Sequence, residues 1–189
     1  MSAICVFCGS SSGSDAVFAE TARELGAAIA SGGHRLVYGG GHVGLMGVIA
    51  DAVLAEGGAV TGVMTEQLVA AEVAHHGVTE LEVAPSMHAR KARMAELSDG
   101  VIVLPGGFGT LDEAFEMITW NQLGLVAVPV VFLDETGYFD ALFEFVDRSV
   151  ASEFVSPANA ALMRRATSVD DALAEATAPA AAFTPKWLG

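Results

Sequence analysis

A run of nine residues near the middle of the chain combines glycines with acidic side chains: Pro105-Gly106-Gly107-Phe108-Gly109-Thr110-Leu111-Asp112-Glu113. It follows the apolar stretch 101–104 and opens a segment with helical periodicity. Glycines between a strand and a helix let the backbone approach a ligand closely. Free amides at a helix start attract an anion, most often a phosphate. Two carboxylates stand in the same turn, where a phosphate would repel them, so the run predicts chemistry as well as binding.

Glu113 has two interpretations. Thr110 and Glu113 have the spacing of a capping box, in which Thr110 is the N-cap and Glu113 folds back onto it. Asp112 needs no explanation beyond a favourable interaction with the helix dipole. The position of Glu113 beside a predicted phosphate loop favours a role in chemistry instead, and the spacing leaves both interpretations open.

Positive charge is scarce and concentrated. The net charge is −14, from 23 acidic and 9 basic residues, which disfavours nucleic acid as a partner. The one dense basic cluster is Arg90, Lys91 and Arg93, and we expect Arg90 and Arg93 to share a helix face. Such a run is ordinarily a solvated face. Next to the Gly106 loop of an acidic chain, it suits an anion equally well.

Three other motifs carry less information. Residues 39–44 match GxGxxG, which indicates either nucleotide contact or a tight turn, and no glycine loop has the GKS or GKT ending of a Walker loop. Cys5 and Cys8 have CxxC spacing within an apolar strand, where residues three apart point to opposite faces, so we expect buried free thiols. His75 and His76 lack partners at metal-ligand spacing, and no metal site is expected.

Strand and helix signals alternate along the chain. We expect strands at 3–8, 36–38, 59–64, 79–83, 101–104 and 128–133, and helices at 15–31, 45–56, 87–97, 110–123, 139–152 and 168–177, with a short helix and a loop over 65–78. This pattern predicts one α/β domain over residues 1–177, a doubly wound parallel sheet with helices on both faces. An Ala/Pro-rich tail follows at 178–189. The glycine loops 9–13, 39–44 and 106–109 should then lie along one edge, where such sheets bind ligands.

Composition indicates self-association. Hydrophobic residues make up 52% of the chain and charged residues 17%, which is apolar for a monomer and favours a homodimer. No apolar run approaches the ~20 residues of a membrane helix, so we expect no membrane contact. Because Met1 leads straight into strand-like sequence without a basic signal-peptide region, we expect a cytoplasmic protein.

The glycine–acid run resembles the PGGxGTxxE signature of the LONELY GUY (LOG) family of cytokinin-activating phosphoribohydrolases. Ser86-Met87-His88-Ala89-Arg90-Lys91 resembles the upstream element of the same family. The similarity covers roughly residues 3–155 and includes four further segments: Cys8-Gly9-Ser10-Ser11, Tyr38-Gly39-Gly40-Gly41, Leu45-Met46-Gly47 and Ile118-Thr119-Trp120.

The resemblance implies a dimeric Rossmann-like enzyme without a cofactor. It would hydrolyse the N-glycosidic bond of N6-substituted adenosine 5′-monophosphates, with AMP as a further candidate substrate. Arg90 and Glu113 match the family's catalytic pair. Substrate-binding positions are expected at Glu72, Lys91, Gly106, Gly107, Phe108, Gly109, Thr110, Leu111, Asp112, Thr119, Gly9, Ser10, Gly40, Gly41 and Met46. Asp112 stands where many relatives have Glu, which keeps the charge and shortens the reach.

Breaking the ribose–base bond builds positive charge on the sugar, which a fixed carboxylate stabilises. We therefore hypothesise that Glu113 faces the sugar, while the 106–110 amides and Arg90 or Lys91 hold the 5′-phosphate. Two alternatives stay open. One is a carrier that binds a nucleotide or pterin cofactor without catalysis, and the other is an NAD-dependent enzyme that uses residues 39–44.

Overall fold

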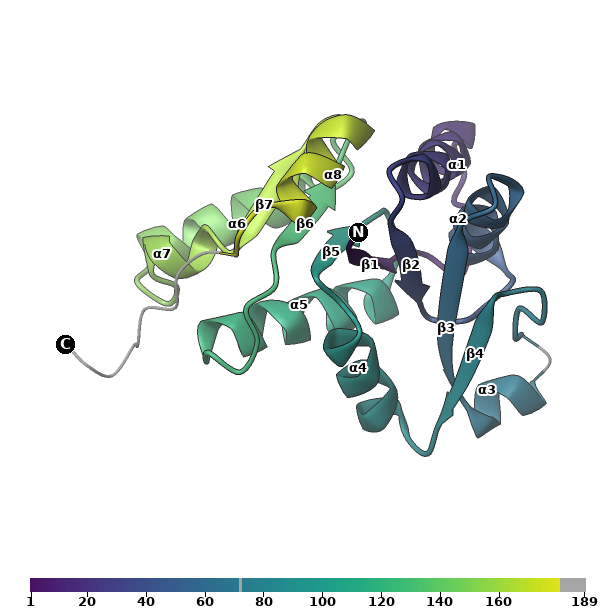
Figure 1. The fold of residues 1–189 in the computed structure, drawn as a ribbon. Coiled ribbons are helices and arrows are strands. Elements are labelled where there is room, and N and C mark those ends of the chain that lie inside the picture. The colour runs from purple at the N-terminus through teal and green to yellow at the C-terminus, as the bar shows by residue number, and fades with distance from the viewer. Residues whose placement is uncertain (72, 181–189) are drawn as a thin grey trace.

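The computed structural model describes residues 1–71 and 73–180. Seven strands form one sheet: β1 (Ala3–Phe7), β2 (Arg35–Tyr38), β3 (Ala59–Thr65), β4 (Glu80–Ala84), β5 (Gly100–Val103), β6 (Val130–Leu133) and β7 (Met163–Ala166). The helices between and after them are α1 (Ala16–Ser31), α2 (Gly44–Ala55), α3 (Glu66–Ala70), α4 (Met87–Glu96), α5 (Phe108–Gln122), α6 (Asp140–Ala151), α7 (Pro157–Ala160) and α8 (Val169–Thr177). Figure 1 shows their arrangement.

The sheet is parallel throughout, with strand order β4-β3-β2-β1-β5-β6-β7. The chain therefore winds outward from β1 in one direction and then, starting at β5, in the other. In such a sheet the ligand crevice lies beyond the carboxyl ends of the two central strands. Here those strands lead directly into the loops that start at Gly9 and Pro105.

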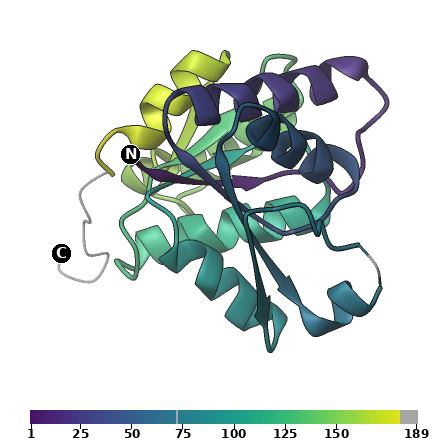
Figure 2. The ribbon, with the colours of Figure 1, turned by 45° about the vertical axis from the view of Figure 1, so that its right-hand side comes forward.

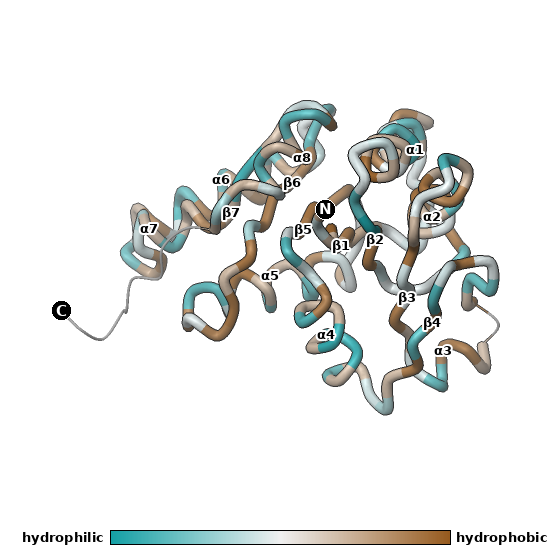
Figure 3. Tube along the Cα trace, viewed as in Figure 1, coloured by the Kyte–Doolittle hydropathy of each residue, from teal (hydrophilic) through white to brown (hydrophobic). Residues whose placement is uncertain are grey.

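Helices cover both faces of the sheet, as Figure 2 shows from the side. On one face, α1, α2 and α8 pack on side chains such as Ile4, Leu36 and Ile102. On the other, α4, α5 and α6 pack on side chains such as Val101 and Phe132. The central strands are buried on both sides, and Figure 3 shows them as mostly hydrophobic. The predicted doubly wound α/β fold is confirmed.

Strand β7 was not predicted. Its sequence, Met-Arg-Arg-Ala, lacks the apolar run of a buried strand because β7 lies at the edge of the sheet. Its ends, Met163 and Ala166, are buried, whereas its two arginines form ion pairs, Arg164 with the half-exposed Glu175 and Arg165 with the buried Asp134. Charged side chains of this kind protect an exposed sheet edge from pairing with another chain.

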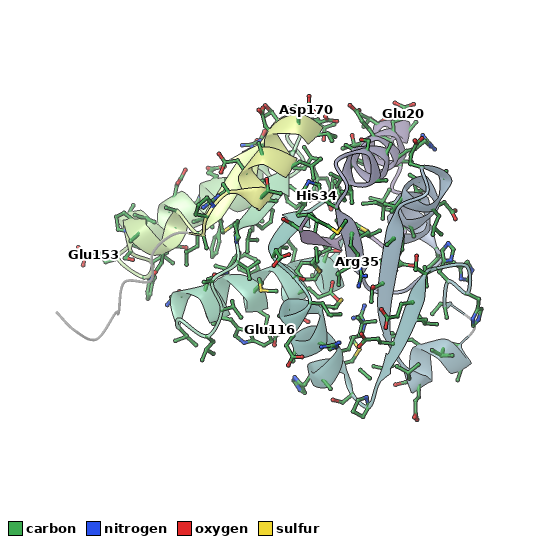
Figure 4. The ribbon with its side chains drawn as sticks, in the orientation of Figure 1. Glu20, His34, Arg35, Glu116, Glu153 and Asp170 are labelled. Carbon is green, nitrogen blue, oxygen red and sulfur yellow. The ribbon has the colours of Figure 1, made fainter. Side chains whose placement is uncertain are left out.

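Residues 181–189 of the expected tail lie outside the described residues, and α8 ends at Thr177 as predicted. Within the described ranges, no helix is long and apolar enough to cross a membrane. The acidic side chains of Glu20, Glu153 and Asp170 lie on the outer surface (Figure 4).

Candidate active site

Three glycine-rich loops meet at the carboxyl edge of the sheet, as the sequence predicts. The Gly9 amide donates to Pro105 O at 3.0 Å, and the Leu45 amide donates to Gly9 O at 3.0 Å. Gly44 has φ +60°, and its backbone lies so close to Ser10 that a Cβ there would overlap the Ser10 backbone. The loops after β1, β2 and β5 therefore form one continuous backbone surface.

Two helices begin at this surface without a side-chain cap. The N-cap residues are Val43 for α2 and Gly107 for α5, and neither side chain bonds to the first turn. By contrast, Asp15 and Ser86 cap α1 and α4 at the same edge. Uncapped amides at a helix start, with the helix dipole behind them, form a binding site for an anion.

The glycines of the central run differ in what surrounds them. A Cβ on Gly106 would overlap the side chain of Thr110 and lie 2.9 Å from Gly9 N. A Cβ on Gly107 or Gly109 would meet nothing within 4 Å. Gly106 is thus required for packing, whereas Gly107 and Gly109 face open space that a ligand can fill.

Arg90 and Glu113 form a buried ion pair at the floor of this surface. Arg90 Nη1 donates to Glu113 Oε1 at 2.8 Å, and the two side chains are 7% and 14% exposed. Arg90 is fixed further, because Nε donates to Val63 O at 2.8 Å and Nη2 to Gly39 O at 3.2 Å. Gly39 has no room for a Cβ because the guanidinium lies against it. Arg90 therefore links β2, β3 and α5 and holds the carboxylate in one place.

Burial raises the pKa of Glu113 above its usual value, although the charge of Arg90 and its hydrogen bond act in the opposite direction. Asp112 adds a smaller upward contribution to this pKa. A carboxyl group whose pKa is shifted by burial and by a specific charge partner, inside a cleft, is typical of a functional site.

A cavity of about 600 Å³ lies over the ion pair. Several predicted site residues line it together: Ser10, Gly41, Met46, Arg90, Gly107, Phe108, Gly109, Thr110 and Glu113. Gly9 and Gly106 line a neighbouring cavity of about 300 Å³, which Ser10 and Gly107 also border. Gly40, which has φ +79°, lies in the loop after β2 and packs against Met64.

Other predicted site residues lie elsewhere. Leu111, Asp112 and Thr119 line a shallow groove on the opposite side of α5, away from Glu113. Lys91 Nζ pairs with Asp112 and Glu116, each at 3.1 Å, and so links α4 to α5 (Glu116 is labelled in Figure 4). Burial lowers the pKa of Lys91, but its two carboxylate partners outweigh that effect and raise it. Glu72 lies outside the described residues.

Two expectations from spacing are wrong. Helix α5 begins at Phe108, with Gly107 as its N-cap, so Thr110 lies inside the first turn and Glu113 pairs with Arg90. The capping box does not form, because Thr110 is buried against Gly106. Arg93 does not join Arg90 at the cavity, since its guanidinium binds Glu82 at 2.7 Å on the outer side of α4.

The CxxC prediction is confirmed. Cys5 and Cys8 are free and buried, and they pack in the cores on opposite faces of the sheet. Burial raises the pKa of Cys5 to about 12 and that of Cys8 above its usual value. Both sulfurs are therefore protonated and unreactive at neutral pH.

Sequence reasoning missed an apolar wall of the cavity, formed by Val43, Met64, Leu68, Val73 and Met87. Met64 ends the third predicted strand at the ligand edge, a position that could have been noticed. Leu68 lies in α3, within the short helix and loop predicted over 65–78, and Val73 lies in the loop that follows, but no motif there indicated a ligand contact. Val73 is placed over the cavity by backbone bonds from His42 N to Val73 O at 3.0 Å and from His75 N to Gly40 O at 2.8 Å.

The sequence of the chain is similar to those of known proteins. Residues 46–176 match the family model described as "possible lysine decarboxylase". The chain is 43% identical to a cytokinin riboside 5′-monophosphate phosphoribohydrolase of Rhodococcoides fascians, over 93% of this chain and 89% of that protein. It is 47% identical to an enzyme of the same name from Arabidopsis thaliana, over 82% and 72% of the two chains.

The chain belongs to the LOG family. The solved molybdenum cofactor binding protein of Rippkaea orientalis has the same fold, with a TM-score of 0.69 over 92% of this chain and 93% of its own. The molybdenum cofactor carrier protein of Chlamydomonas reinhardtii aligns with a TM-score of 0.68 over 92% and 94%. At 21% and 22% identity, these two structures show that this LOG chain shares their fold alone.

Proposed function

We propose that this LOG protein hydrolyses the N-glycosidic bond of N6-substituted adenosine 5′-monophosphates to free base and ribose 5-phosphate. The observation that carries the proposal is the buried Arg90–Glu113 pair, which lies in the same cavity as the uncapped start of α5. One part of that cavity suits a sugar cation and the other suits a phosphate. The names of relatives that are 43–49% identical support the same reaction.

The chemistry assigned to Glu113 follows from its fixed position. As the bond from C1′ to the base stretches, positive charge builds on the ribose, and a carboxylate already in place stabilises it. Water then supplies a hydroxyl to C1′ and a proton to the departing base. Because Arg90 holds Glu113 while its own guanidinium is anchored by two further hydrogen bonds, to Val63 O and Gly39 O, the carboxylate needs no reorganisation during the step.

The 5′-phosphate is assigned to the amides of Gly107, Phe108, Gly109 and Thr110. Leu111 is the first residue of the helix whose amide bonds back, to Gly107 O at 3.1 Å. The phosphate anchors the ribose beside Glu113 and so contributes binding energy to orientation. We assign the base and its N6 substituent to the apolar wall, where Met64, Leu68 and Met87 offer methyl and methylene contacts.

We further propose that the protein is a homodimer that pairs through the α5 side. Phe108, Phe115, Leu123 and Leu125 are exposed there at 94%, 36%, 51% and 67%. Phe108 and Phe115 line the shallow groove that also holds Leu111, Asp112 and Thr119, which are predicted to bind substrate but face away from Glu113. A second copy seated on α5 would enclose these residues at the interface. We also propose that residues 1–177 form the catalytic domain, that residues 178–189 form a tail, and that the protein is cytoplasmic.

Base release tests the proposed function. The protein is incubated with N6-isopentenyl-AMP, AMP or N6-isopentenyladenosine, and free bases are separated by chromatography. The proposal expects base from N6-isopentenyl-AMP and much less from the nucleoside that lacks the phosphate. Absence of base from both nucleotides would contradict it and favour a carrier, and a nicotinamide-dependent absorbance change would favour a dehydrogenase.

A further inference from the structure

Tyr138 reaches the phosphate loop from outside the catalytic cavity. It lies in the turn between β6 and α6, directly after Gly137, which has φ +78°. Its hydroxyl donates to Gly106 O at 2.8 Å. The ring packs edge-on against Phe18 and Phe139, with centroid distances of 5.7 and 5.0 Å. The two rings thus fix the direction in which the hydroxyl points.

The bond to Gly106 O determines where the next amide points. Gly106 C=O and Gly107 N–H belong to one planar trans peptide, in which they point in opposite directions. Gly106 and Tyr138 border the smaller, neighbouring cavity, whereas Gly107 also borders the cavity that contains Glu113. With the carbonyl held toward Tyr138, the Gly107 N–H is turned away from it, toward the catalytic side.

A Gly-Gly peptide needs such an anchor. Glycine has no Cβ to restrict its dihedral angles, so the peptide between two glycines can rotate at little cost. The preceding peptide is already held, because Gly9 N donates to Pro105 O at 3.0 Å. The following residues are held by α5. The Tyr138 hydroxyl is the side-chain donor to the one peptide between these two fixed segments.

We propose that Tyr138 is a positioning residue for phosphate recognition, which it serves by holding the Gly106–Gly107 peptide so that the Gly107 amide faces the 5′-phosphate. This inference rests on the proposed function, since it assumes that the start of α5 binds the phosphate of a nucleoside monophosphate. It assigns Tyr138 no contact with the substrate.

The test compares Tyr138→Phe with Tyr38→Phe. The chain has two tyrosines. The Tyr38 hydroxyl is buried and has no hydrogen-bond partner within the described residues, so its removal controls for the loss of a hydroxyl. Binding of carbocyclic AMP and carbocyclic adenosine is measured by calorimetry, since neither analogue has a hydrolysable glycosidic bond. Kinetics with N6-isopentenyl-AMP and thermal unfolding are measured in parallel.

We expect Tyr138→Phe to weaken carbocyclic AMP binding by about three- to tenfold, the effect of one hydrogen bond. Carbocyclic adenosine binding and the unfolding temperature should not change, and the kinetic loss should fall on KM more than on kcat. Tyr38→Phe should leave the ratio of the two affinities at the wild-type value. An equal effect on both analogues, or none on either, would overturn the inference. Wild-type protein that binds both analogues equally would instead overturn the phosphate assignment in the proposed function.

Discussion

Arg90 Nη1 lies 2.8 Å from Glu113 Oε1, and both side chains are almost closed off from solvent. These residues are 23 positions apart in the chain. They meet because α4, which precedes β5, and α5, which follows it, cover the same face of the sheet. The pair has consequences for both stability and catalysis. Arg90 compensates the buried charge of Glu113. Glu113 in turn neutralises much of the positive charge of Arg90, which we had expected to hold the phosphate.

Breaking the pair from one side should destabilise the fold. Arg90→Met leaves the Glu113 carboxylate buried without its cation, so we expect the free energy of unfolding to fall by about 3–5 kcal/mol at neutral pH. The double variant Arg90→Met/Glu113→Gln removes both charges and should recover most of that loss while remaining inactive. Urea denaturation of the three proteins measures this. Equal stability of Arg90→Met and the wild type would contradict a buried, compensating pair.

The raised pKa of Glu113 predicts the acid side of the pH profile. In the proposed mechanism the ionised carboxylate is the active form, and a pKa above the usual 4.5 means that it is protonated at a higher pH than an ordinary glutamate. We therefore expect kcat/KM to fall with decreasing pH through a midpoint above 4.5. Near-UV circular dichroism at each pH separates this loss from unfolding. A midpoint at or below 4.5 would contradict the assignment.

Two glycine substitutions separate packing from ligand binding. Gly106→Ala places a methyl group against Thr110 and Gly9 N, and we expect it to lower the free energy of unfolding by about 1–3 kcal/mol. Gly109→Ala meets no protein atom within 4 Å and should leave stability unchanged or slightly higher. It should nevertheless raise KM for the nucleotide by about tenfold, a loss of 1.4 kcal/mol of binding. A Gly109→Ala protein with wild-type KM would place the phosphate elsewhere.

We expect two copies of the chain to form a homodimer through the α5 side. Sedimentation should give about twice the 19.4 kDa mass of one chain. Phe115→Glu puts a charge into the proposed interface, and we expect it to yield monomer with reduced activity. Val83→Glu alters a half-exposed apolar residue on edge strand β4 and serves as the matched control, with mass and activity unchanged. A monomeric wild-type protein, or a dimeric Phe115→Glu variant, would argue against this interface.

Much of the fold could be predicted, because it follows from patterns of neighbouring residues in the sequence. Buried strands such as 101–104 show as apolar runs, and strands alternating with helices allow few topologies. Strand β7 escaped prediction because an edge strand can carry Arg164 and Arg165 at its centre without burying them.

The site was predictable only in part. The glycine loops could be placed at one edge because parallel strands share a direction, and the run 105–113 indicated the half of the site to which we assign the phosphate. The partner of Glu113 could not be read from spacing, because its bond to Arg90 depends on how α4 packs beside α5. Tyr138 and Val63 lie in no motif, and the roles of Tyr138 and of the Val63 and Gly39 carbonyls could not be predicted, since hydrogen bonds to backbone oxygens leave no residue pattern in the sequence.

Product analysis of Glu113→Gln tests the central claim most directly. Gln keeps the size of the side chain and an acceptor for Arg90 but removes the negative charge. With N6-isopentenyl-AMP, the wild type should release base and ribose 5-phosphate in equal amounts. Glu113→Gln should reduce kcat by at least about a hundredfold while still binding carbocyclic AMP. Turnover by Glu113→Gln at the wild-type rate would contradict the account, because the buried carboxylate would then have only a structural role.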